Sequence, residues 1–359
     1  DTVTLLEKVG YYLDNEIQDR YRDYRDQGYA KQDISSLIEE HLDLVGVLSR
    51  SSADWDGGYA VAGVVGHGDA FVMRDPWGIR PLCIGKLGDT YMVASESCAF
   101  DVLGAEFVRD VEPGEIVSIS PKTGIVSDKS RCLPKEKEAR CVFEYIYFAR
   151  PDSHIDGISV YSSRIQAGKY LAMDSPVEAD LVVGVPESGN AAALGYSLQS
   201  GIPYGTAFVK NSYIGRTFIK PKQSNRESSV QVKLNVLKEN VKGKRIIMVD
   251  DSIVRGTTSA NIVTMLRNAG ATEVHVRISS PPFKFPCYFG TDIPSGDQLI
   301  ANHHTIDEIR QLLGADSLGY LDCDRMNEMV KDLEYCDACF TGNYPVDPPT
   351  RDIRGDMEV

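Results

Sequence analysis

Residues 244–260 read KRIIMVDDSIVRGTTSA, an apolar run followed by two carboxylates and a turn rich in hydroxyl groups. The β-branched run from Ile246 to Val249 predicts a buried parallel strand that ends in Asp250 and Asp251. Phosphate groups bind backbone N–H groups, hydroxyls and helix N-termini, whereas paired carboxylates suit ribose hydroxyls or Mg²⁺. A bare Asp-Asp-Ser turn is more often a solvated helix cap, but the whole string favours ribose-phosphate chemistry.

The apolar residues after this loop recur at the spacing of a helix, and Gly270 stands where a C′ glycine would end it. The stripe consists of Ile262, Met265, Leu266 and Ala269. A second strand is expected from Val274 to Ile278, so the local order is strand, phosphate loop, helix, strand. Open α/β sheets bind ligands at the carboxyl ends of their strands, which is where this loop lies.

Composition and charge limit the class of protein. The chain has 359 residues, enough for two domains, with 42% hydrophobic and 25% charged residues. Its net charge of -14 makes DNA or RNA an unexpected partner. No apolar run approaches the ~20 residues that span a bilayer, and the sequence DTVTLLEK lacks the blocks of a signal peptide. We expect a cytoplasmic protein with no membrane partner, in which eight cysteines serve metal, cluster or buried-thiol roles rather than disulfides.

The first half of the chain divides into helical and β segments. A helical stripe runs from Ile34 to Val45, with Asp33 as a candidate cap, and the charged segment 14–28 predicts a solvated surface helix. Short β segments with turn signals between them follow from Gly57, which predicts a layered α+β unit. These segments are YAVAGVV, DAFVMRD, TYMVAS and GEIVSIS. A charged stretch broken by proline, residues 121–140, is the predicted linker.

Strands and helices alternate after the linker, which predicts a parallel sheet. The expected order is DLVVGVP, a helix from Ala191 to Gln199, IPYGTAFV, RIIMVD and EVHVRI. A second phosphate-type loop, GVPESGN at 184–190, follows the first of these strands and could cradle a pyrophosphate with backbone N–H groups. Many α/β turns look similar, so this loop indicates phosphate binding only in combination with the Asp-Asp loop. The last residues, 346–359, are expected to form a loose tail.

Two further stretches each allow more than one functional interpretation. Residues 210–222, KNSYIGRTFIKPK, combine cations, glycine and aromatics, which suits either a mobile lid over a pyrophosphate or a basic surface hairpin. Cys336 and Cys339 form a CxxC pair, which suits zinc or iron–sulfur ligation but also buried or redox thiols. Sequence spacing alone does not separate zinc from an iron–sulfur cluster.

Several strings together resemble the glutamine phosphoribosylpyrophosphate (PRPP) amidotransferase family, the amidophosphoribosyltransferases that open de novo purine synthesis. The strings are RDPWGIRPL (74–82), ASESCAFD (94–101), EPGEIV (112–117), CVFEYIYFARPDSHIDG (141–157), YIGRTFIKP (213–221), the Asp-Asp loop, PCYFGTD (286–292) and CDACFTGNYP (336–345). The resemblance implies a truncated α+β glutaminase domain of the N-terminal-nucleophile fold with αββα layers, in 1–130. An α/β type I phosphoribosyltransferase domain with a mainly parallel sheet would follow in 131–345, before the tail.

The resemblance also implies cofactors and site residues. In the iron–sulfur branch of the family, the positions that match Cys141, Cys287, Cys336 and Cys339 hold a [4Fe–4S] cluster. Mg²⁺ would be bound by Ser188, Asp250 and Asp251, with the two carboxylates as catalytic residues. The implied substrate-binding residues are Glu187, Ser188, Gly189, Arg216, Ser252, Arg255, Gly256, Thr257, Thr258, Ser259 and Asp1.

The start of the chain departs from the family pattern. The family's glutaminase uses an amino-terminal cysteine as nucleophile, its α-amine as base and an Asn-Gly oxyanion hole, and none of these occurs here. Asp1 resembles the carboxylate that binds the α-amino group of glutamine, well inside that domain. The expectation is therefore a fragment of a longer protein, in which the ammonia-dependent transferase half is complete and the glutaminase is not.

The function expected from the resemblance is conversion of PRPP, glutamine and water to 5-phosphoribosylamine, glutamate and pyrophosphate. Purine nucleotides as feedback inhibitors and a homo-oligomer are implied as well. Two alternatives remain: a phosphoribosyltransferase that uses a free nucleobase, and a non-catalytic regulator that binds PRPP or nucleotides. The strings around Trp77 and Glu96 disfavour the first, and the lack of a DNA-binding module or basic surface disfavours the second.

Overall fold

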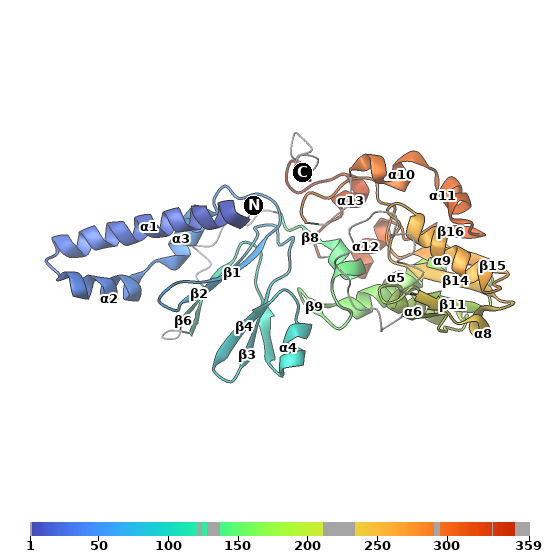
Figure 1. Cartoon of the computed structure of the whole chain (residues 1–359), viewed down its shortest axis with the longest axis horizontal. Helices are drawn as coiled ribbons and strands as arrows, with labels where there is room; N and C mark the ends of the chain where they lie inside the picture. The colour runs from blue at the N-terminus through green and yellow to red at the C-terminus, as the bar shows by residue number, and fades with distance from the viewer. Residues whose placement is uncertain are drawn as a thin grey trace. The chain divides into compact units, whose positions relative to one another are not determined.

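The computed structural model describes residues 2–120, 124–127, 137–210, 234–290, 295–331 and 333–348 (Figure 1). The chain divides into two compact units, residues 1–140 and 141–359. The division falls ten residues after the predicted domain limit at 130, and most of the predicted linker lies outside the described residues. None of the described helices combines the length and apolar character that a bilayer crossing requires.

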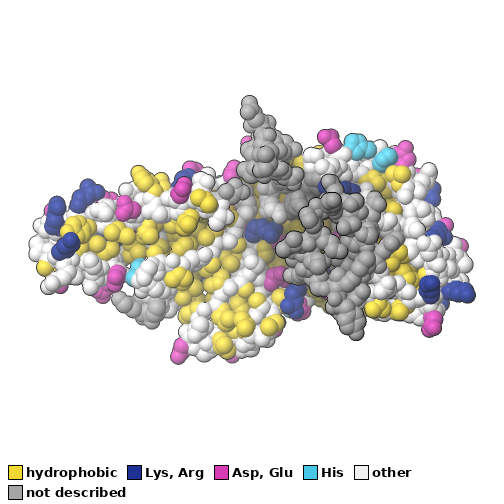
Figure 2. All heavy atoms as spheres, in the orientation of Figure 1, with side chains coloured by type: hydrophobic (Ala, Val, Ile, Leu, Met, Phe, Trp, Pro, Cys, Tyr) yellow, Lys and Arg dark blue, Asp and Glu magenta, His cyan; other side chains and the backbone are white. Residues whose placement is uncertain are grey.

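The first unit opens with three helices, α1 (Thr2–Asp26), α2 (Lys31–His41) and α3 (Leu44–Ser51). α1 and α2 run side by side as a helical hairpin (Figure 1). No residue of α1 is buried, which confirms the predicted surface helix at 14–28. Figure 2 shows hydrophobic side chains along this part of the surface. Leu6 of α1 is 71% exposed.

The predicted helical stripe from Ile34 to Val45 is divided between two helices, and Asp33 is not a cap. α2 begins two residues before Asp33, after Ala30. The helix ends at His41, and the Asp43 carboxylate then accepts a hydrogen bond from the Gly46 N–H at 3.1 Å. An N-cap of this kind satisfies one of the orphan N–H groups of a new helix, so Asp43 starts α3 where the apolar spacing alone suggested continuity.

Two antiparallel sheets complete the first unit. One has the order β1 (Ala60–Val64), β2 (Ala70–Arg74), β6 (Ile116–Ser120), β7 (Gly124–Val126). The other has the order β4 (Thr90–Ala94), β3 (Cys83–Leu87), β5 (Glu106–Asp110), with helix α4 (Cys98–Leu103) beside it. The four predicted β segments are confirmed as β1, β2, β4 and β6, whereas β3, β5 and β7 were not predicted.

Alternation along β2 places this unit in layers. Phe71 and Met73 pack with Leu48 of α3, whereas Val72 packs with Ile84 of the second sheet. Successive strand residues point to opposite faces, so one sheet lies between α3 and the other sheet. The unit is therefore α+β with a helix–sheet–sheet order.

The second unit contains a four-stranded parallel sheet, as predicted. Its order is β11 (Leu181–Gly184), β14 (Arg245–Asp250), β15 (Glu273–Ile278), β16 (Ser317–Tyr320). Helices α5 (Val160–Asp174) and α6 (Gly189–Ser200) share a core with Ile247 and Val249 on one face. Helices α9 (Thr257–Asn268) and α11 (Ile306–Leu313) share a core with Ile246 and Met248 on the other. Both faces are covered, which is the usual state of a parallel sheet.

Glycines allow α5 and α6 to approach at backbone distance. A Cβ on Gly168 would lie 1.8 Å from the carbonyl oxygen of Ala192, and one on Gly195 would lie 2.0 Å from that of Ile165. These distances are far below van der Waals contact, so each glycine faces the backbone of the other helix. The two helices therefore form one tightly joined layer on that face of the sheet.

The remaining elements are short. They are β8 (Arg140–Cys141), a π-helix (Glu144–Phe148), β9 (His154–Ile155), β10 (Ile158–Ser159), β12 (Phe208–Lys210), β13 (Leu234–Val236), α8 (Lys238–Val241), a 3₁₀ turn (Gly296–Gln298), α10 (Ile300–His303), α12 (Asp324–Met329), β17 (Tyr335–Cys336) and α13 (Ala338–Thr341).

The segment IPYGTAFV was predicted to be a strand of the parallel sheet, and this is wrong for most of it. Tyr204 makes only an isolated parallel bridge with Val182. The following strand, β12, turns away and pairs antiparallel with β13. Gly205 itself still lies against β11: a Cβ there would lie 2.8 Å from Leu181, and its N–H donates to the Val182 carbonyl at 2.9 Å.

Candidate functional site

The structure brings the two predicted phosphate-type loops together at the carboxyl ends of β11 and β14. These strands are parallel neighbours, with Gly184 paired to Val249. Beyond the strand, the Val185 N–H donates to the Val249 carbonyl at 2.9 Å. The Ser188 hydroxyl then donates to Asp251 Oδ1 at 2.6 Å, joining residues that lie 63 positions apart. The site therefore combines a hydroxyl from one loop with the carboxylates of the other.

Gly189 permits this close approach of the loops. A Cβ at Gly189 would lie 2.3 Å from the Val249 carbonyl oxygen, so any side chain would force the loops apart. Gly184 is confined in the same way, since its Cβ would lie 2.6 Å from Asn190 Cα. Helix α6 begins at Gly189, so its first turn is packed directly against the end of β14.

Two buried carboxylates define the electrostatics of the site. Asp250 and Asp251 are 7% and 8% exposed. Burial first, and then the charge of Asp251, raise the pKa of Asp250 well above its ordinary value. Asp251 also accepts hydrogen bonds from the hydroxyls of Ser188 and Ser252. Two buried carboxylates, even with hydroxyl neighbours, need a nearby positive charge if both are to stay ionised.

Mg²⁺ fits this donor set because it prefers hard oxygen ligands and is usually held by one or two carboxylates plus substrate phosphates. Within the part of the chain that the structure describes, no group of three or more His, Cys, Asp or Glu residues is arranged to hold a metal ion by itself. Two aspartates and a serine therefore form an incomplete ligand set, of the kind that a phosphorylated substrate completes.

The rest of the Asp-Asp loop leads into the N-terminus of α9. Gly256 has φ +80°, the left-handed region that glycine tolerates, and the helix begins at Thr257. Thr257 and Thr258 are exposed and Ser259 is buried. The N–H groups of a helix's first turn have no intrahelical acceptor and lie at the positive end of its dipole. This arrangement suits a phosphate.

Two of the other predicted substrate-binding residues, Glu187 and Arg255, have exposed side chains with partners of their own. Glu187 is exposed and forms an ion pair with Lys210 at 3.2 Å. Arg255 is exposed and donates to the side chain of Gln298. Arg216, with the rest of the predicted lid after Lys210, lies outside the described residues, and so does Asp1.

Tyr147 is a neighbour of the carboxylates that the sequence did not single out. It belongs to the π-helix, and burial, Asp251 and Asp250 together raise the pKa of its phenol. The segment CVFEYIYF was considered only for Cys141, and no spacing rule connects Tyr147 to a loop a hundred residues later. Its place in the site follows from the tertiary fold alone.

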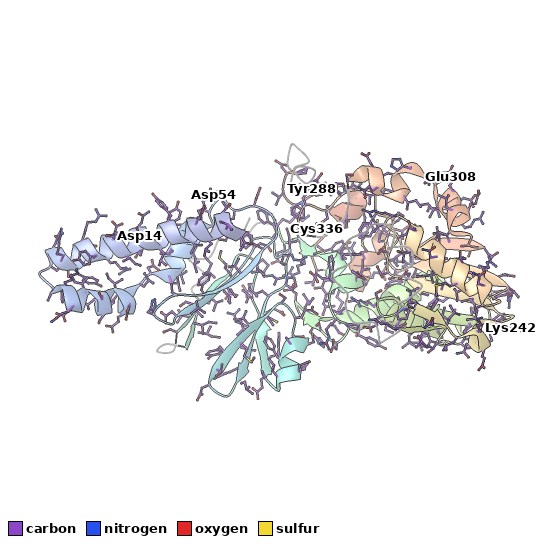
Figure 3. All side chains as sticks on the ribbon, viewed as in Figure 1. Asp14, Asp54, Lys242, Tyr288, Glu308 and Cys336 are labelled. Atoms are coloured by element: carbon purple, nitrogen blue, oxygen red, sulfur yellow. The ribbon has the colours of Figure 1, made fainter. Side chains whose placement is uncertain are left out.

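The four predicted cluster cysteines come close enough to influence one another's ionisation. Burial raises the pKa of Cys339 well above its ordinary value, and Cys141, Cys287 and Cys336 raise it further. Burial also raises the pKa of Cys336 to about 12, with Cys287 adding to the shift. In Figure 3, Cys336 lies in the same part of the second unit as Tyr288, the neighbour of Cys287. The four thiols therefore lie within electrostatic range of one another, although the described residues show no group of three or more of them arranged to hold a metal ion.

No protein-family model matches the chain. Individual proteins do. An amidophosphoribosyltransferase from Archaeoglobus fulgidus is 48% identical over 349 residues, covering 94% of this chain and 74% of the relative. The chain belongs to the amidophosphoribosyltransferase family. The Bacillus subtilis amidophosphoribosyltransferase is 49% identical over 322 residues, covering 88% of this chain and 67% of that one.

Two solved structures of the family agree along most of the chain. One is described as the allosteric regulatory enzyme of purine biosynthesis, with a TM-score of 0.79 and 45% identity, covering 93% of this chain and 74% of that one. The other is the glutamine PRPP amidotransferase from B. subtilis complexed with ADP and GMP. It has a TM-score of 0.78 and 44% identity, and covers 94% of this chain and 75% of that one. The predicted family is confirmed, and with it the prediction of a pentosyltransferase enzyme of purine biosynthesis.

Proposed function

We propose that the chain transfers ammonia to PRPP, releasing pyrophosphate and forming 5-phosphoribosylamine. The observation that carries this proposal is the buried Asp250–Asp251 pair, bonded to Ser188 where two phosphate-type loops meet. In the reaction the ammonia nitrogen bonds to C1 of the ribose while the C1–O bond to pyrophosphate breaks. Pyrophosphate leaves with the bonding electron pair, and the new amine loses one proton.

Different residues would bind the different parts of PRPP. Ser252 to Ser259 and the N-terminus of α9 would bind the 5-phosphate through N–H groups and hydroxyls. Glu187, Ser188 and Gly189 would lie on the pyrophosphate side, with Arg216 as a cation for the same anion. Ser188, Asp250 and Asp251 would hold Mg²⁺, which supplies positive charge against the departing pyrophosphate. Burial of the carboxylates keeps this electrostatic interaction away from bulk water.

We propose that ammonia is normally made from glutamine by a glutaminase of the N-terminal-nucleophile type to which residues 1–130 belong. Asp1 would bind the glutamine α-amino group. The 359 residues contain no Cys-Gly start or Asn-Gly pair to serve as nucleophile and oxyanion hole. A polypeptide of these residues alone is therefore proposed to use ammonium but not glutamine.

We expect pyrophosphate release from PRPP with ammonium chloride and Mg²⁺, and none above background with glutamine. The measurement is a coupled pyrophosphate assay run in parallel with each nitrogen source, with Mg²⁺ omitted as the control. Glutamine-driven turnover by these 359 residues would contradict the proposed division of labour. Release that depends on a free nucleobase instead of ammonium would contradict the transferase assignment itself.

We further propose that Cys141, Cys287, Cys336 and Cys339 hold a [4Fe–4S] cluster. All four are thiols, the ligand type of such clusters, and Cys339 lies within electrostatic range of the other three. Their segments start, cross and end the second unit, so the cluster would have a structural role. Cys83, Cys98 and Cys323 do not belong to this set, and Cys132 lies outside the described residues.

Anaerobically purified protein is expected to be brown and to contain about four iron and four sulfide per chain, in the ratio of a [4Fe–4S] cluster. Replacing Cys336 by serine should remove most of the iron and lower the melting temperature, because a thiolate ligand is lost. Cys98→Ser, in the first unit, is the matched control and should keep its iron. Zinc in place of iron, or full iron in Cys336→Ser, would contradict the cluster.

Other expectations remain proposals. The B. subtilis relative was solved with ADP and GMP, which supports purine nucleotides as regulators here. A homo-oligomer and a cytoplasmic location are proposed from the family resemblance. The net charge of -14 gives no support to a nucleic-acid partner.

A further inference from the structure

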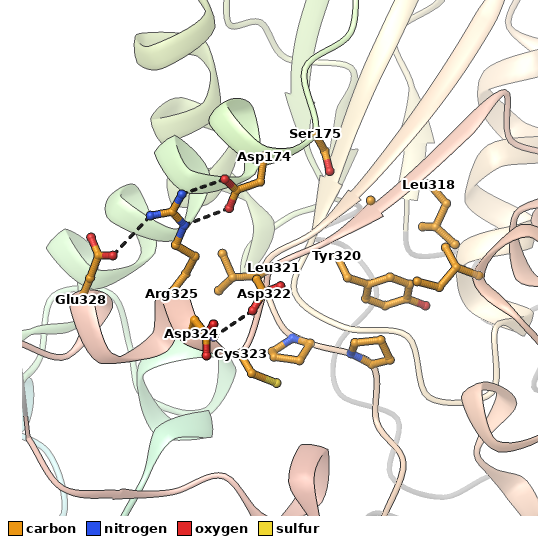
Figure 4. Close-up of a pocket in the computed structure, with 14 residues that line it drawn as sticks. Asp174, Ser175, Leu318, Tyr320, Leu321, Asp322, Cys323, Asp324, Arg325 and Glu328 are labelled. Carbon is orange, nitrogen blue, oxygen red and sulfur yellow. Dashed lines mark hydrogen bonds and ion pairs between the residues drawn. The ribbon is translucent and has the colours of Figure 1, made fainter.

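A pocket of about 740 Å³ opens beside β16 (Figure 4), and no residue of the Asp-Asp loop lines it. Its wall includes the consecutive residues 318–321 at the end of the strand. Side chains of consecutive strand residues point to opposite faces of a sheet, so a pocket that meets Leu318, Gly319 and Tyr320 in succession reaches β16 from its edge or its end and not from one face. Among the strands that the structure describes, β16 is the last in the sheet order, so the pocket lies at an edge of the described sheet.

The cores on the two sides of the sheet confirm this placement. Leu318 and Tyr320 pack against the core that contains α9 and α11. Leu321 belongs to the core that contains α5. Gly319 presents no side chain at the centre of the wall, and Pro281 adds an apolar surface. An extended peptide could add to such an edge through its own N–H and C=O groups.

The charges at the pocket are mostly negative. Asp174, Asp322, Asp324 and Glu328 line it with a single cation, Arg325. Arg325 is already neutralised: its guanidinium lies 2.8 Å from Asp174 Oδ1 and 3.2 Å from Glu328 Oε1 (Figure 4). Asp322 and Asp324 are exposed, and neither has a cationic partner within the described ranges. These two carboxylates are available to a ligand.

We propose that the β16 edge binds an extended segment of a partner protein in which basic and apolar residues alternate. Successive side chains of an added strand point to opposite faces. Apolar side chains on one face would meet Leu318 and Tyr320, and the basic side chains between them would reach Asp322 and Asp324 with their charged ends. A second copy of the same edge is disfavoured, because the pocket lining offers these carboxylates no cation except Arg325, which is already paired. No residue of the two phosphate-type loops lines the pocket, and the proposal does not depend on the proposed reaction.

The test uses two acetylated, amidated hexapeptides of alternating sequence, Lys-Val repeated three times and Glu-Val repeated three times. Titration calorimetry of the full chain at low salt is expected to show binding of the lysine peptide only, weakening as salt is added. Hydrogen exchange should slow at residues 317–321, because added-strand pairing protects edge amides whereas nonspecific charge attraction does not.

The double variant Asp322→Asn and Asp324→Asn should weaken the lysine peptide by on the order of tenfold, since two exposed ion pairs are lost. Asparagine at 322 keeps an oxygen for the Asp324 N–H, which now donates to Asp322 Oδ1 at 2.9 Å, so the helix start should be preserved. Asp89→Asn with Asp101→Asn, both exposed in the first unit, is the charge-matched control and should leave binding unchanged.

Three results would overturn the proposal. They are equal binding of the two peptides, unchanged exchange at residues 317–321 with the lysine peptide bound, and equal weakening by the control pair. Spermidine is the probe for a simple cation site: full competition by it at the peptide's own concentration would assign the pocket to small amines instead.

Discussion

Replacing Asp251 by asparagine is expected to lower ammonia-dependent turnover of PRPP by about 10²–10³-fold, the size of effect seen when one group that stabilises developing charge is removed. Asp251 is buried and accepts hydrogen bonds from Ser188 and Ser252, so the neutral amide keeps the shape but loses the charge that would hold Mg²⁺. The measurement is pyrophosphate release as a function of Mg²⁺ and PRPP concentration.

Stability should move in the opposite direction from activity in this variant. Asp251 contributes to the raised pKa of Asp250, so removing its charge relieves repulsion between two buried carboxylates. Without Mg²⁺, the melting temperature of Asp251→Asn is expected to equal or exceed that of the unchanged chain. Asp101→Asn, at an exposed site in the first unit, should alter neither quantity. A variant that loses activity only because it unfolds would refute this account.

Replacing Gly168 by alanine is expected to destabilise the second unit by about 3 kcal/mol or more, the upper range for a methyl group forced into a packed interior. The new Cβ would lie 1.8 Å from the Ala192 carbonyl oxygen. Backbone cannot rotate away as a side chain can, so α5 and α6 would have to separate. Thermal unfolding and denaturant titration would both report the change.

Gly10→Ala provides the matched control, since Gly10 is also a glycine inside a helix but has no atom within 4 Å of the position that a Cβ would take. Alanine there should stabilise α1 by about 0.5–1 kcal/mol, because glycine loses more backbone entropy on folding. If Gly168→Ala and Gly10→Ala changed the free energy of unfolding alike, the close contact between α5 and α6 would not be the cause of the destabilisation.

Elements with strong periodic signals were predictable from the sequence. The strand that ends at Asp250 and the helix that ends before Gly270 match β14 and α9, because a buried apolar run and a C′ glycine are local signals. The segment at 202–209 was misassigned, since only its neighbours decide whether an extended chain pairs with the sheet. The cap at Asp43 was missed because the apolar spacing continued across it.

The site was predictable in parts but not as a whole. Each phosphate-type loop carried its own composition signal, yet the hydrogen bond from Ser188 to Asp251 depends on β11 and β14 being adjacent strands. Tyr147 had no such signal, because Asp250 and Asp251 influence its phenol only once the chain has folded. The composition of each loop predicts its chemistry, whereas the order of strands in the sheet decides which loops lie close together.

The spread of the four cysteines along the chain has a consequence for biosynthesis. Cys141 begins the second unit, Cys287 lies beyond β15, and Cys336 and Cys339 stand near the end of the described residues. A ribosome releases them in that order, so the last two thiols emerge only after all four strands of the parallel sheet have been made. Any group that needs all four must be inserted after translation of the sheet is complete, and a nascent chain stalled before Cys336 could fold its strands but could not retain that group.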